Sequence, residues 1–185
     1  MSINKLFTQI YFTVLVLIFT SQLSFAQKFT EYEVKLVYLY QFSRFIDWPE
    51  GTFVDSSRFI IGVYGNNPFG NMPDIILKDK LFKGGESKVI NITTIEDALK
   101  CNMIFFSGLK NYDILKLIKS LDNAPILLVG DQIDDFCIIG GMVNFTQKES
   151  KYRFEVNPDF AKNANLTMSS KLFSIAKIIN KEGNF

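Results

Sequence analysis

Few side chains in this sequence could act as a nucleophile or a general base. The chain has no histidine, which excludes Ser-His-Asp and Cys-His catalytic arrangements and metal sites built on imidazole. The carboxylates of Asp131, Asp134 and Asp135 follow a predicted strand and offer oxygen ligands that Mg²⁺ or Ca²⁺ could use. We interpret them instead as a solvated loop that caps a turn, a common role of Asp. The sequence therefore predicts no catalytic residue, no metal site and no cofactor.

Two groups of residues are candidates for a ligand crevice. Gly65, Asn66 and Asn67 lie between a predicted strand and a predicted helix, where free amides can bind anions. This segment lacks the glycine spacing of a dinucleotide motif and the lysine of a P-loop, which favours a simple tight turn. Arg153 and Glu155 alternate along a later strand and therefore share one of its faces. A salt-bridged sheet face is the alternative to a ligand contact there.

The chain has two cysteines, Cys101 and Cys137. In an oxidising compartment they could form one disulfide bond, provided that their Cα atoms lie within ~7 Å of each other. Two separate buried thiols are an equal alternative. A chain of this length can bury a core without a crosslink.

Residues 1–26 have the features of a secretory signal peptide. Lys5 precedes the apolar run of residues 10–19, and small residues flank Phe25 where a signal peptidase would cut. An uncleaved membrane anchor is the alternative, but polar residues interrupt the ~20 apolar residues that such an anchor needs. We expect cleavage after Ala26, export, and no stable membrane insertion. The rest of the chain carries equal numbers of basic and acidic residues, so its charge does not indicate nucleic-acid binding.

Strand and helix patterns alternate along the rest of the chain. Apolar runs typical of buried strands occupy residues 58–64, 88–92, 103–106 and 125–129. Helices are expected at residues 69–77, 94–100 and 111–121, from residue 158, and from Ser169 or Ser170 to about residue 181. The segments 142–146 and 152–156 predict an antiparallel hairpin. We therefore predict a single three-layer α/β domain, residues 27–185, whose mixed sheet has parallel core strands, a C-terminal antiparallel hairpin and flanking helices.

The first predicted helix, which begins near Thr30 and ends before Pro49, is apolar on nearly every side. Its apolar surface exceeds the ~100° stripe that an amphipathic helix buries against its own core. Part of it should therefore contact a partner or a second copy of the chain. Nineteen phenylalanines are also more than a small core usually holds, so some should be exposed. The candidate partner-binding residues are Tyr38, Tyr40, Phe42, Trp48, Phe69 and Phe136.

Seven segments, in order along the chain, resemble the YfiR-like family. They are residues 33–42, 45–49, 62–70 (GVYGNNPFG), 101–107, Phe136 with 140–145, 153–157 (RFEVN) and 166–172 (LTMSSKL). The resemblance implies an exported, mostly periplasmic α/β domain without enzymatic activity. It also implies a regulator that binds the periplasmic sensor domain of an inner-membrane diguanylate cyclase and so limits cyclic-di-GMP output and biofilm formation. Gly62 stands where this family has a disulfide partner for Cys101, so the resemblance does not extend to a redox switch.

Two classes of function thus remain. The first is a periplasmic interaction protein, with a homodimer as its expected state. The alternative is a small-ligand binding module whose crevice near residues 65–70 receives a nucleotide or an aromatic metabolite, in the service of a sensor kinase or an outer-membrane system.

Overall fold

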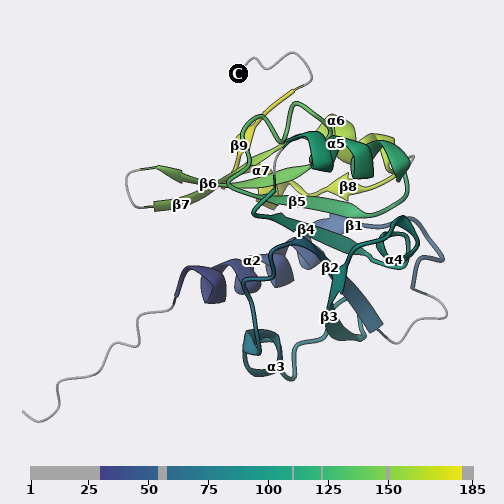
Figure 1. The fold of residues 1–185 in the computed structure, drawn as a ribbon, viewed down its shortest axis with the longest axis vertical. Helices are drawn as coiled ribbons and strands as arrows, with labels where there is room; N and C mark the ends of the chain where they lie inside the picture. The colour runs from purple at the N-terminus through teal and green to yellow at the C-terminus, as the bar shows by residue number, and fades with distance from the viewer. Residues whose placement is uncertain (1–29, 54–57, 110, 122, 149–150, 181–185) are drawn as a thin grey trace, which may run out of the picture. The chain divides into compact units, whose positions relative to one another are not determined.

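The computed structural model describes residues 30–53, 58–109, 111–121, 123–148 and 151–180. The predicted signal peptide lies outside these residues. From Glu31 onward the chain forms one compact unit, drawn in Figure 1. None of the helices described is long and apolar enough to cross a membrane.

A seven-stranded sheet with the order β3-β2-β4-β5-β6-β7-β9 forms the middle of this unit (Figure 1). Its strands are β2 (Arg58–Gly65), β3 (Glu86–Ile92), β4 (Met103–Ser107), β5 (Leu127–Asp131), β6 (Val143–Lys148), β7 (Lys151–Val156) and β9 (Lys177–Ile178). The strands from β3 to β6 are parallel to their neighbours, whereas β7 is antiparallel to β6 and β9 is parallel to β7. The predicted mixed sheet and its C-terminal hairpin are confirmed. Strand order reverses between β2 and β4, as in doubly wound α/β folds.

Helices cover both faces of the sheet, as predicted. On one face lie α2 (Glu31–Phe45) and α3 (Met72–Ile76), and on the other α5 (Asn111–Ser120) and α6 (Pro158–Asn163). The helix α4 (Ile95–Ala98) and the helix α7 (Ser170–Phe173) are shorter. Consecutive residues of β4 point to opposite faces of the sheet. Phe105 contacts Phe69 and Phe145 on the α2 side, whereas Phe106 contacts Phe136 on the other side. All five residues of β4 are buried, as expected for a strand covered on both sides.

A small second sheet ties the end of α2 to a late segment of the chain. Its strand β1 (Ile46–Asp47) pairs antiparallel with β8 (Thr167–Met168). Beside this ladder, the amide of Ser169 donates a hydrogen bond of 2.8 Å to the carbonyl of Phe45.

Several predicted helices are wrong in extent. The first, expected to continue until just before Pro49, ends at Phe45 and is followed by β1. The helix predicted over residues 69–77 is limited to α3, with Pro73 in its first turn, where the missing N–H of proline is tolerated. The last predicted helix ends at Phe173, and β9 follows it. There the amide of Ile179 donates to the carbonyl of Val156 over 2.8 Å. Isoleucine is common in strands, and the edge of β7 offers backbone amides and carbonyls with which another strand can pair.

Candidate functional site

The surface of α2 is covered largely by its own domain. Leu36, Leu39 and Phe42 are fully buried. Phe42 packs against the rings of Phe145 and Phe154 of the hairpin. Among the described residues of α2, Val37, at 36 % exposure, is the one exposed large apolar side chain. The aromatic surplus of this helix therefore serves mainly the core.

The predicted exposure of Phe42, Phe69 and Phe136 is wrong, because all three side chains are 0 % exposed. The ring of Phe136 lies against two glycines: a Cβ atom on Gly130 would come within 2.8 Å of it, and one on Gly141 would be closer still. Glycine at both positions makes the space that this ring fills. The remaining candidates, Tyr38, Tyr40 and Trp48, are half-buried.

A buried charge cluster lies at the carboxyl edge of the sheet. Lys35 of α2, fully buried, forms ion pairs with Glu31 one turn earlier and with Asp131 at the end of β5. The hydroxyl of Ser107, at the end of β4, donates to Asp131 over 3.2 Å. Gln132 donates to Glu31 over 2.9 Å. Doubly wound sheets bind ligands at this edge; here the first turns of α2 lie over it.

The cluster corrects our interpretation of the Asp131 loop and supplies a residue that sequence reasoning missed. The side chain of Asp131 is 5 % exposed, so it is not a solvated turn cap, whereas Asp134 and Asp135 are exposed. Lys35 was overlooked because its neighbours in the helix are apolar. A single lysine among apolar residues of a helix is a signal that the sequence does offer, because such a lysine needs a counter-charge when it is buried.

The electrostatics of the cluster favour a charged lysine beside a neutral tyrosine. Burial lowers the pKa of Lys35, but its hydrogen bonds to Asp131 and Glu31 outweigh this effect, and the pKa is raised overall. Burial and the charge of Asp131 raise the pKa of Tyr32. The ammonium of Lys35 also lies 4.8 Å from the centroid of the Tyr32 ring, a cation–π contact. Such an arrangement holds α2 in place.

The turn after β2 is built from backbone contacts, as the tight-turn interpretation predicts. Gly65 has φ +99°, and a Cβ atom there would clash with the carbonyl oxygen of Ser107. Asn66 donates its amide to that oxygen over 3.0 Å. The side chain of Asn67 accepts from the amide of Phe69 over 3.0 Å and donates to Asn91 over 2.6 Å.

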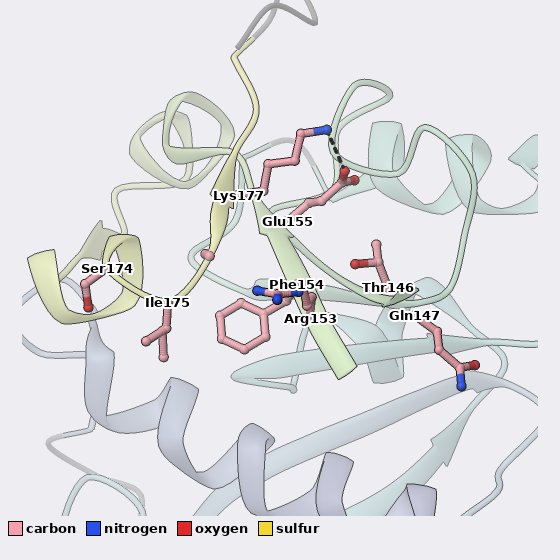
Figure 2. Close-up of a pocket in the computed structure, with 9 residues that line it drawn as sticks. Thr146, Gln147, Arg153, Phe154, Glu155, Ser174, Ile175 and Lys177 are labelled. Carbon is pink, nitrogen blue, oxygen red and sulfur yellow. Dashed lines mark hydrogen bonds and ion pairs between the residues drawn. The ribbon is translucent and has the colours of Figure 1, made fainter. Parts of the chain in front are cut away.

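Arg153 and Glu155 line a separate cavity of about 600 Å³. Figure 2 shows it between the hairpin and the segment from Ser174 to Lys177. Glu155 pairs with Lys177 over 3.2 Å, while the exposed Arg153 has no carboxylate within ion-pair distance in the described part of the chain. Three strands separate β7 from β2, so the structure does not bring the two halves of the candidate crevice together.

The two cysteines are free and buried, so the disulfide alternative is wrong and the two-thiol alternative holds. Cys101 precedes β4 and Cys137 follows β5, which places them beyond opposite ends of neighbouring parallel strands. Burial raises the pKa of Cys101 to about 11 and raises that of Cys137 further. A Cβ atom on Gly62 would lie 2.7 Å from the sulfur of Cys101. In the described residues no three His, Cys, Asp or Glu side chains are grouped to hold a metal ion.

The fold and these sites define a doubly wound α/β domain whose polar groups serve mainly its own packing and whose surface offers an open cavity. More specifically, the chain belongs to the YfiR/HmsC-like family, whose model matches residues 32–177. This family consists of periplasmic regulators rather than enzymes. No curated protein matches the chain.

Proposed function

We propose that the protein is an exported, periplasmic regulator that binds the sensor domain of an inner-membrane signalling protein, such as a diguanylate cyclase, and restrains it. The observation that carries this proposal is the family match, which extends from α2 to β9. Release of the regulator would raise cyclic-di-GMP and promote biofilm formation. The protein would act by occupying its partner's surface, without chemistry of its own.

Tyr40 is the best placed of the remaining aromatic candidates. Its half-buried ring lies 5.8 Å from the guanidinium of Arg44 and 5.9 Å from the ammonium of Lys80. Tyrosine and arginine are common among residues that dominate binding energy. Two cations beside this ring favour a partner surface that carries carboxylates. The charge cluster of Lys35 fixes α2, so this surface is preorganised for binding.

A pull-down from solubilised envelope membranes tests the proposal. Tagged protein should recover one specific membrane sensor, and Tyr40→Ala with Arg44→Ala should reduce the yield at least tenfold, since each hot-spot truncation costs ~2 kcal/mol. Lys162→Ala, on the exposed side of α6, is the matched control and should bind normally. Deleting the gene should raise cyclic-di-GMP. Recovery of no membrane protein, together with unchanged cyclic-di-GMP, would contradict the regulator.

A small-ligand module is the second candidate, and the cavity in Figure 2 favours it. Arg153 and Lys177 at its walls would suit an anionic group. Thermal-shift measurements with AMP and with 4-hydroxybenzoate, on wild-type protein and on Arg153→Ala, test it. A shift that Arg153→Ala abolishes would support the module, and no shift with either probe would count against it. We also propose that the protein is a homodimer.

A further inference from the structure

The strand β3 is an open edge of the sheet. It pairs with β2 from Glu86 to Ile92 and, among the described residues, with no other strand. Figure 1 shows it at the margin of the sheet. Such an edge presents a row of unpaired amides and carbonyls, which another extended chain can satisfy.

A groove accompanies this edge, and exposed apolar residues precede and follow β3 in the sequence. A cavity of about 930 Å³ runs beside residues 86–89, with Pro73, Leu77 and Leu81 among its other lining residues. Ile75 and Leu81, 68 % and 58 % exposed, are the most exposed large apolar side chains that the structure describes. Ile95 and Leu99, in and after α4, are also exposed. Four of the eight exposed large apolar residues found in the described chain thus lie within residues 75–99, in the segments that precede and follow β3 in the sequence.

The charged side chains of β3 indicate which strand can pair with its open edge. Glu86 and Lys88 are both exposed and, being two residues apart, share one face of the strand. In an antiparallel pair of β3 strands centred on Ser87, each Glu86 lies opposite Lys88 of the other copy. Centring the pair on Lys88 would instead place like charges opposite each other, which is unfavourable. The strand is therefore complementary in charge to a second copy of itself in one register.

We propose that two copies of this chain associate through β3, antiparallel about a twofold axis at Ser87, and so join their sheets into one. Such an interface is isologous, so each side chain contributes twice. The formal net charge of the chain is only +1, so electrostatic repulsion between two copies is weak. The inference does not depend on what the protein regulates.

Charge exchange tests the register. Light scattering after gel filtration should give the mass of a dimer for the wild-type protein. Glu86→Lys and Lys88→Glu each turn both symmetric pairs into like-charge pairs, so each should weaken the dimer roughly tenfold. The double variant Glu86→Lys/Lys88→Glu restores opposite charges and should recover the wild-type mass. Lys162→Glu makes the same charge change as Lys88→Glu on α6 and should have no effect.

Urea unfolding of each variant at dimer-dissociating dilution checks that the monomers remain equally stable, as expected for exposed side chains. Hydrogen exchange gives a second readout, because amides of residues 86–89 should be protected in the dimer and lose this protection in the single variants. A monomeric wild-type protein, or a dimer that the single variants leave intact, would overturn the proposal. So would a double variant that stays monomeric, since the charges would then not set the register.

Discussion

The substitution Lys35→Met tests the charge cluster that joins α2 to β5. Methionine is unbranched, of similar length and a good helix former, so it removes the ammonium while keeping most of the packing. The side chains of Lys35 and Asp131 are 1 % and 5 % exposed. In the variant the carboxylate of Asp131 would stay buried without its counter-charge.

The expected loss is large relative to the stability of a domain. Removing one partner of a buried ion pair costs about 3–5 kcal/mol, against ~5–15 kcal/mol for a whole domain. For a domain of this size 1 kcal/mol changes the Tm by ~2–4 °C, so the Tm should fall by about 6–20 °C.

Urea unfolding, followed by the fluorescence of the single tryptophan, Trp48, measures this loss. The midpoint should fall while the slope stays unchanged, because the fold is kept. Lys100→Met is the matched control. Lys100 also pairs with a glutamate four residues earlier, but its side chain is 55 % exposed, so its replacement should change the stability very little.

The double variant Lys35→Met/Asp131→Leu should be more stable than Lys35→Met alone, because it leaves no unpaired buried charge between these two positions. If Lys35→Met lowers the free energy of unfolding no more than Lys100→Met does, Asp131 is not desolvated in solution and the reasoning from the buried pair is refuted.

Further substitutions and measurements test the core, the thiols and the N-terminus. Phe42→Ala should cost about 3–5 kcal/mol by opening a cavity, whereas Tyr40→Ala should cost less and weaken partner recovery; equal losses of stability in thermal melts would contradict this distinction. Both thiols should resist Ellman's reagent at about pH 8 in the native state and react in urea, and Cys101→Ser should stay folded; rapid native labelling would contradict their burial. Because folding raises the pKa of Cys101 from 9.0 to about 11, its contribution to stability should be complete below about pH 9 and lost as the pH rises towards 11, as pH-dependent unfolding would show. Gly62→Cys should form a disulfide bond with Cys101 on oxidation, seen by mass spectrometry and absent in Gly62→Ser; two free thiols in the oxidised variant would contradict the contact seen here. N-terminal sequencing of the envelope protein should begin at Gln27, and an intact Met1 chain in the membrane fraction would contradict signal cleavage.

Local sequence patterns were sufficient to predict most of the sheet. The run of residues 103–106 is apolar throughout because both faces of β4 are covered, and such runs have few alternatives in an α/β chain. The hairpin was equally readable, since β6 and β7 pair over six positions on either side of a short polar connection. The turn residues Gly65 and Asn67 also act as their types predict.

What the sequence did not predict depends on contacts between distant residues. Phe136 is buried because Gly130 and Gly141 leave room for its ring, and a count of phenylalanines cannot show this. Lys35 and Asp131 belong to different layers of the fold, so neither signals the other in the sequence. The apolar residues from Leu172 to Ile179 have helical spacing, but Lys177 and Ile178 form the strand β9, because the edge of β7 stabilises the extended form.

The ladder between β1 and β8 has a consequence for how the protein folds. Ile46 pairs with Met168, and α2 packs against the hairpin of β6 and β7. A chain that leaves the ribosome or a translocation channel N-terminus first therefore presents α2 long before its native partners emerge. Such distant contacts slow folding and leave apolar surface exposed in the meantime. Part of the apolar surface of the first helix thus has its native cover only in the last third of the chain.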